Sequence, residues 1–212
     1  MKVMYFFLTI PFYLLMKLFY KLNLDNFQID FVKCEKNLKS VQQLLDEEII
    51  NILFIAEDHR VLRHFGIDHY AMLRAIYYTK FKNQFQGAST IAQQYVRVIT
   101  QRYERTWKRK LREQLLAILI SHKFSNQQIA TAYLKIAFLG SDMDGLDHYL
   151  KWKKVNHKLS TSEKIEIVAR LKYPEPLNNK EIWRSKIKIR VSNISCKLAT
   201  HNASSLKGGA VT

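Results

Sequence analysis

Helical spacing of apolar residues, in a chain with few helix-breaking residues, is the strongest constraint on the fold. Trp107, Leu111, Leu115 and Ile118 recur at intervals of three and four, which predicts a helix that buries one face. The 212 residues include six Gly and three Pro, too few for a structure with many turns. No segment alternates convincingly like a β-strand. We therefore predict an all-α fold with one core of ordinary size, to which Trp107 contributes.

Other segments predict helices with defined ends. Apolar residues at helical spacing begin at Val41, and this helix is expected to carry Glu57 and Asp58 at its C-terminal end. Gly66 marks a break, and Asp68 is expected to cap the next helix. Further caps are predicted at Thr90 (a capping box with Gln93), at Ser125, and at Ser160 (a capping box with Glu163).

The N-terminus is apolar enough to enter a membrane. Residues 3–16 carry no charge, and with residues 17–20 they reach the roughly 17–20 residues that a bilayer span needs. We predict an uncleaved anchor over 1–22; the alternative is an apolar helix that lies on a membrane or packs on the domain. The expected order is then a linker over 23–40, with the edge of a first subdomain as the alternative, a folded domain over 41–200 that ends in a basic helix, and a disordered tail over 201–212.

The charge balance indicates an anionic partner. A formal net charge of +16 suits nucleic acid, anionic lipid or a phosphorylated substrate. No base-reading motif accompanies it, so nucleic acid is not an expected partner. Cys34 and Cys196 lie far apart and match no metal or redox spacing, and we predict no metal site.

Cations gather around one carboxylate in residues 87–113. Glu113 follows Arg109 by four residues and Lys110 by three, so on a helix it lies beside both. Such a group suits a phosphate ligand, although a solvated basic helix face is the plain alternative. Glu57 and Glu113 are the predicted catalytic pair, one as base and one to orient or stabilise. Spacing alone supports this weakly, because the chain has eighteen acidic residues.

Four motifs in order strengthen the hypothesis. They are Glu57-Asp58-x-x-Val61-x-x-His64-x-Gly66, then Gly87-Ala88-Ser89-Thr90-Ile91-Ala92-Gln93-Gln94, then Arg105-x-x-x-Arg109-Lys110-x-x-Glu113, and last Ile129-x-x-x-Tyr133-Leu134 with Gly140. Over about residues 40–195 the chain resembles the glycosyltransferase domain of class A penicillin-binding proteins and the monofunctional peptidoglycan glycosyltransferases (family 51).

The resemblance implies a lysozyme-like, two-lobed, mainly α-helical domain behind a membrane helix, on the outer face of the bacterial cytoplasmic membrane. It implies polymerisation of lipid II into glycan strands, with inversion at the anomeric carbon and release of undecaprenyl diphosphate. Its partners would be lipid II, the growing strand, membrane lipids and proteins of cell-wall synthesis or division. No cofactor is expected for certain; a divalent cation (Mg²⁺ or Mn²⁺) at the diphosphate stays open.

By position in the motifs, Glu57 would be the general base, and Glu113 would orient groups around the leaving diphosphate. The residues implied in substrate binding are Ser89, Thr90, Gln93, Gln94, Arg97, Arg105, Arg109, Lys110 and Arg112.

The chain also departs from the family pattern. Arg97 stands for Lys, Ile120 for a frequent Glu, and Thr131 and Lys135 for Glu and Asn. These departures leave two alternatives open: a relative that uses another polyprenyl-diphosphate-linked glycan, or a catalytically inactive accessory protein that binds lipid II.

Overall fold

The structure, a computed structural model, describes residues 2–208, with side chains through residue 203. Helices dominate it, and in that part of the chain the strand-like pairs are isolated bridges, Phe138 with Asp144 and Gly140 with Glu175. The all-α prediction is confirmed. The chain divides into two compact units: unit 1 comprises Met1–Leu44 and Arg60–Tyr133, and unit 2 comprises Leu45–His59 and Leu134–Thr212.

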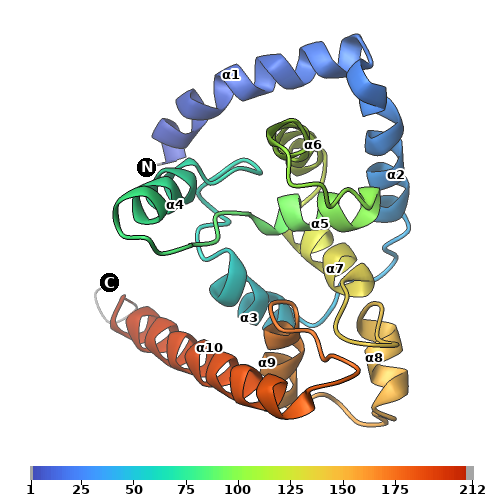
Figure 1. The fold of residues 1–212 in the computed structure, drawn as a ribbon, viewed down its shortest axis with the longest axis vertical. Helices are drawn as coiled ribbons and strands as arrows, with labels where there is room; N and C mark the ends of the chain where they lie inside the picture. The colour runs from blue at the N-terminus through green and yellow to red at the C-terminus, as the bar shows by residue number, and fades with distance from the viewer. Residues whose placement is uncertain (1, 209–212) are drawn as a thin grey trace. The chain divides into compact units, whose positions relative to one another are not determined.

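Unit 1 is built around α6 (Trp107–Lys123), whose residues 112–120 are all buried. Three other helices pack against α6, as Figure 1 shows: α1 (Lys2–Lys21), α2 (Phe27–Lys39) and α5 (Ile91–Thr100). The 3₁₀ turn η1 (Leu24–Asn26), α4 (His69–Phe81) and the first part of α7 (Asn126–Ile136) complete the unit.

The expected linker over 23–40 is wrong, because most of it is helix α2. Phe27, Phe31, Cys34 and Leu38 form an apolar stripe at helical spacing, and each is almost wholly buried. Charged residues separate these four in the sequence, and for that reason their helical spacing was not recognised as a helix.

Helix α1 passes as a membrane span by length and composition, and among the described residues it is the one helix that does. In unit 1 it also makes polar contacts with the start of α4. The Tyr5 hydroxyl donates to Asp68 Oδ1 at 2.8 Å, and Thr9 Oγ1 lies 3.0 Å from His69 Nε2. Other α1 side chains, Phe7 among them, remain exposed. The helix therefore packs on the domain with one side and presents an apolar surface with the other.

Unit 2 holds α3 (Glu47–Glu57), α8 (Leu146–Trp152), α9 (Thr161–Arg170) and α10 (Lys180–Gly208). Helix α3 packs against α9 and α10. At the start of α3, buried Lys164 pairs with Asp46 at 2.5 Å and also with Glu48. At the other end, Glu57 is its last residue, as expected.

Three predicted helix features differ in the structure. Helix α3 begins at Glu47 rather than near Val41, because the Asp46 side chain caps it by accepting from Glu48 N. Helix α10 runs on to Gly208 through the expected tail, because no Gly or Pro interrupts it earlier; residues 209–212 lie outside the described residues. Trp107 is 72% exposed and not part of the core, because the first turn of α6 precedes its buried stretch.

The predicted caps largely hold. Asp68 accepts from Ala71 N at 2.9 Å, and Ser160 with Glu163 forms a full capping box. Ser125 accepts from Gln128 N. At α5 only half of the box is present: Thr90 accepts from Gln93 N, while the Gln93 amide oxygen accepts from Lys110.

The Ser160 cap makes the stability of α9 sensitive to acid. Its backbone N–H and hydroxyl donate to Glu163 Oε2 at 2.8 and 2.7 Å, and they lower the pKa of Glu163 from 4.5 to about 2. A lowered pKa in the folded state contributes stability above pH 4.5 that is lost as pH falls towards 2. In Glu163→Gln, urea denaturation over this range should therefore show a weaker pH dependence than wild type. Glu181→Gln, on α10, is the control and should keep the wild-type dependence; an unchanged dependence in Glu163→Gln would contradict the assignment.

Candidate functional site

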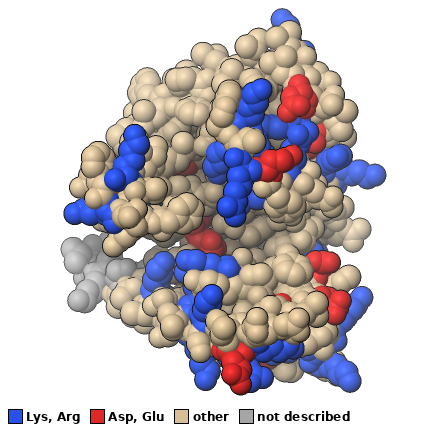
Figure 2. Space-filling view, viewed as in Figure 1, with Lys and Arg blue, Asp and Glu red and all other residues tan. Residues whose placement is uncertain are grey.

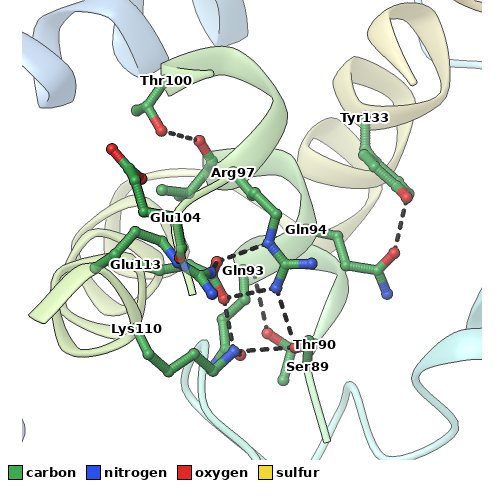
Figure 3. Close-up of polar contacts among 12 residues, drawn as sticks. Ser89, Thr90, Gln93, Gln94, Arg97, Thr100, Glu104, Lys110, Glu113 and Tyr133 are labelled. Carbon is green, nitrogen blue, oxygen red and sulfur yellow. Dashed lines mark hydrogen bonds and ion pairs between the residues drawn. The ribbon is translucent and has the colours of Figure 1, made fainter. Parts of the chain in front are cut away.

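Glu113 on α6 lies at the centre of a buried ionic cluster with three cations. Arg97 on α5 donates from Nε to Oε2 at 2.9 Å and from Nη2 to Oε1 at 3.1 Å (Figure 3). Arg109 and Lys110, on α6 itself, donate to Oε2 at 2.5 Å and to Oε1 at 2.6 Å. We call Glu113, Arg97, Arg109 and Lys110 the Glu113 cluster. The predicted neighbourhood of Glu113, Arg109 and Lys110 is confirmed.

The cluster keeps Glu113 ionised. Burial acts to raise the pKa of Glu113, but hydrogen bonds and charge from Arg97 and Lys110 outweigh it and hold that pKa below its ordinary value. Burial, together with the charges of Arg97 and Arg109, lowers the pKa of Lys110 against the opposing effect of Glu113. The cluster thus combines one fixed negative charge with a surplus of positive charge.

Arg97, which stands where the family pattern has Lys, uses its full planar group. Two of its nitrogens contact the two oxygens of one carboxylate, and a lysine could not reproduce this paired geometry. This departure therefore strengthens the hold on Glu113.

Ser89 and Gln93 connect the cluster to the turn before α5. Lys110 Nζ donates to Ser89 Oγ and to Gln93 Oε1, each at 2.9 Å, and Arg97 Nη2 donates to Ser89 Oγ at 3.3 Å. Gln93 Nε2 is buried and has no hydrogen-bond partner among the described residues. The side-chain amide of Gln93 therefore keeps a donor, beside the cations, that makes no hydrogen bond within the described residues.

Thr90 has a structural part. It is buried, and its hydroxyl donates to Gly66 O at 2.7 Å, which ties the turn before α5 to the turn after α3. Gly66 has φ +86°, and an added Cβ would lie 2.5 Å from Ala117 O on α6. Only glycine allows this approach, so the Thr90 contact helps to hold a backbone that no other residue could adopt without strain.

One side of the cluster is open to solvent. The Arg97 and Lys110 side chains are 31% and 32% exposed, against 2% for Glu113. Figure 2 shows basic and acidic side chains gathered over α5 and α6. The cavity inside is about 10 Å³, room for about one water molecule. An anion would therefore contact the exposed sides of Arg97 and Lys110 rather than enter the cluster.

Arg112 was predicted to bind substrate, but the structure directs it away from the cluster. It is 3% exposed, and its Nη2 donates to Asp30 on α2 at 2.7 Å. Asp25 accepts from its Nη1 at 3.1 Å, and Arg102 also pairs with Asp30. The role of Arg112 in unit 1 is therefore to dock α2 on α6.

The other predicted binding residues differ in their surroundings. The Gln94 Oε1 atom accepts from the Tyr133 hydroxyl at 2.7 Å, across from the cluster in Figure 3. Arg105 is exposed just before α6 and has no ion pair among the described residues.

Glu57 belongs to unit 2, whereas the Glu113 cluster belongs to unit 1. Its Oε1 accepts from Arg190 Nη2 on α10 at 2.6 Å, and the same nitrogen donates to Ala56 O at 3.1 Å. The side chains of Glu57 and Arg190 are 16% and 11% exposed. The Arg190 contact therefore fixes the position of the Glu57 carboxylate at the end of α3.

Comparison with known proteins gives the family. A family profile described as Transglycosylase matches residues 28–195, most of the chain. The chain belongs to the transglycosylase family. It is 38% identical over 104 residues to penicillin-binding protein 1A of Aquifex aeolicus, covering 49% of this chain and 14% of the relative. It is 34% identical over 122 residues to a biosynthetic peptidoglycan transglycosylase of Haemophilus influenzae, covering 56% of this chain and 50% of the relative. The chain thus spans half or less of the length of these relatives.

Two departures from the transglycosylase pattern lie in the core. Ile120 and Thr131 are both 0% exposed, so neither side chain is available to a ligand. The replacement of the family's residues by Ile120 and Thr131 therefore concerns the packing of the helices, and the Glu113 cluster is intact.

Sequence reasoning missed Asp30, Arg102 and Arg190. Asp30 lies in the supposed linker, on the buried side of α2 beside the overlooked apolar stripe. Periodicity in that segment could have revealed the helix. Arg190 is one of several cations on α10, and no spacing distinguishes it from the others.

Glu113→Gln should be strongly destabilising, because three cations would lose their shared partner in a buried place. Removal of one member of a buried ionic group typically costs about 3–5 kcal/mol. Urea denaturation should show a loss of this order, with Glu104→Gln as control, since exposed Glu104 engages Arg109 through its backbone carbonyl. A loss below about 0.5 kcal/mol, typical of surface substitutions, would contradict the analysis.

Proposed function

We propose that this chain is a peptidoglycan glycosyltransferase that polymerises lipid II into glycan strands and releases undecaprenyl diphosphate. The observation that carries the proposal is the Glu113 cluster, with its exposed cations, in a member of the transglycosylase family. A relative that matches 56% of this chain is named a biosynthetic peptidoglycan transglycosylase, which supports the same activity here.

The cluster suits the leaving group. Breaking a sugar–diphosphate bond puts negative charge on phosphate oxygens, and fixed donors stabilise charge that develops there. Arg97 and Lys110 offer such donors, and Glu113 holds both in position through hydrogen bonds of 2.6–3.1 Å. Lys110, Arg97 and the half-buried Ser89 would therefore contact the diphosphate.

Glu57 supplies the base in this proposal. It takes the proton of the 4-hydroxyl of an incoming N-acetylglucosamine, whose oxygen attacks the anomeric carbon of the growing strand. The bond to the diphosphate oxygen breaks, and the diphosphate leaves with the electron pair. Attack opposite the leaving group inverts the anomeric centre.

We propose no protein-bound metal in this step. Both oxygens of Glu113 accept hydrogen bonds from cations at 2.5–3.1 Å, so this carboxylate does not fit a metal ligand. A divalent cation (Mg²⁺ or Mn²⁺) that assists would be bound by the diphosphate itself, and no step depends on it here.

The proposed location is the outer face of the bacterial cytoplasmic membrane, with α1 in contact with the lipid. The apolar length of α1 and its exposed side chains support contact with lipid tails. The partners proposed are lipid II, the growing strand, membrane lipids and proteins of cell-wall synthesis or division.

The deciding experiment is polymerisation of labelled lipid II by the full chain in detergent. Wild type should form long strands, and Glu57→Gln should lose about 100-fold or more, the usual contribution of a general base. Glu47→Gln, an exposed carboxylate at the other end of α3, is the matched control and should stay active.

The other outcomes distinguish the alternatives. Equal activity of wild type and Glu57→Gln would overturn the assignment of the base. Binding of lipid II without polymer from wild type would favour an accessory protein. Polymer from another polyprenyl-diphosphate glycan alone would change the substrate.

A further inference from the structure

The segment that joins α5 to α6 exposes two aromatic side chains of unit 1. Tyr103 is 61% exposed, and Trp107, the first residue of α6, is 72% exposed. We call these two residues the aromatic pair. Aromatic side chains are usually buried, because each one removes a large apolar area from contact with water. Two that are exposed on one short segment indicate a surface that binds a partner.

Contacts on both sides hold this segment in place. Arg102 Nε donates to Asp30 Oδ2 at 3.1 Å, and Arg109 Nε donates to the backbone carbonyl of Glu104 at 2.8 Å. The residues on either side of Tyr103 are therefore anchored to other parts of unit 1. The aromatic pair is thus presented by a fixed backbone, and a ligand that binds there has less chain to order than on a loose loop.

Two cations lie beside the aromatic pair and indicate what kind of ligand it binds. Arg105 and Lys108 are exposed, and neither has a hydrogen bond or an ion pair within the described residues. A hydrocarbon chain laid across this segment would displace water from both charges without replacing its hydrogen bonds, which is costly. A sugar ring instead packs its apolar C–H face on an aromatic ring, while the oxygens at its edge accept hydrogen bonds from Arg and Lys. The combination therefore favours a sugar over a hydrocarbon chain.

The aromatic pair lies next to the Glu113 cluster. Trp107 precedes Lys110 by three residues on α6, so the two share one side of the helix and are about 4.5 Å apart along its axis. Figure 3 shows Glu104, the neighbour of Tyr103, beside Glu113. In the proposed function Lys110 binds the diphosphate, and the sugar is bonded directly to that group. The ring of this sugar therefore falls within about one helical turn of Lys110, where the aromatic pair is exposed.

We propose that Tyr103 and Trp107 form a platform on which the sugar next to the diphosphate stacks, and that Arg105 and Lys108 donate hydrogen bonds to the oxygens of this sugar. This inference rests on the proposed function and names the part of the substrate that the segment recognises. The platform binds the sugar equally before and during the reaction. Its loss therefore raises KM for lipid II and leaves kcat nearly unchanged.

The first test measures initial rates of lipid II polymerisation by the full chain in detergent. Trp107→Ala and Tyr103→Ala should each raise KM about fivefold, the size of a typical aromatic contact, with kcat close to wild type. Trp107→Phe keeps an aromatic face and should stay within about twofold of the wild-type KM. Trp152→Ala, on α8 of unit 2, is the matched control, because Trp152 is also exposed, at 47%, and also lies between lysines. This control should keep the wild-type KM.

The second test measures the fluorescence of Trp107 and does not depend on turnover. The chain has three tryptophans, so the difference between wild type and Trp107→Phe gives the signal of Trp107. Lipid II should change this signal, because a sugar covers the indole. Undecaprenyl diphosphate has the same hydrocarbon chain and diphosphate without the sugar, and it should leave the signal unchanged. Addition of phosphatidylglycerol vesicles without either ligand should also leave it unchanged.

The contrary outcomes are distinguishable from one another. A wild-type KM in Trp107→Ala, or a loss confined to kcat, would overturn the inference and leave the proposed function intact. An equal signal from lipid II and undecaprenyl diphosphate, or a signal from vesicles alone, would overturn the sugar platform in favour of a lipid contact. Absence of polymer from wild type would instead overturn the proposed function, and the Trp107 signal would then decide whether the segment binds a lipid-linked sugar.

Discussion

The buried carboxylate of Glu113 is the interaction on which the rest of unit 1 depends. It gives Arg97, Arg109 and Lys110 one shared partner, and the distances of 2.5–3.1 Å leave these cations little freedom. Without it, like charges from α5 and α6 would repel one another across the helix contact. The negative charge of Glu113 thus allows α5 and α6 to pack together although both carry cations at their contact.

A second ionic contact holds the N-terminal segment to the same helix. Asp30 on α2 pairs with both Arg112 and Arg102. The cations of α6 therefore point to different sides of the helix, because Arg109 and Lys110 contact Glu113 whereas Arg112 contacts α2. The segment before the motifs is therefore part of the fold. Its polar contacts through Tyr5 and Thr9 add to this attachment.

The sequence predicted what short-range spacing controls. Helix caps at Asp68 and Ser160, and the i, i+3 and i, i+4 neighbours of Glu113, follow from 3.6 residues per turn and are present. Partners distant in the chain were beyond such reasoning. Arg112 lies 82 residues from Asp30, and nothing in its local spacing separates a cation that docks a helix from one that binds a ligand. Trp107 failed for a related reason, since periodicity gives the apolar face of a helix but not where its buried part begins.

The partners of α3 have a consequence for synthesis of the chain. The partner of Asp46, at the start of α3, is Lys164, which is synthesised 118 residues later. The partner of Glu57, at the end of α3, is Arg190, which is synthesised 133 residues later. At roughly 5–20 residues per second, a ribosome needs on the order of 10 s to add that length. During this time the nascent α3 lacks both ionic partners and the helices that cover its apolar side. The ionic partners of α3 are thus added only after every residue of unit 1 has been made.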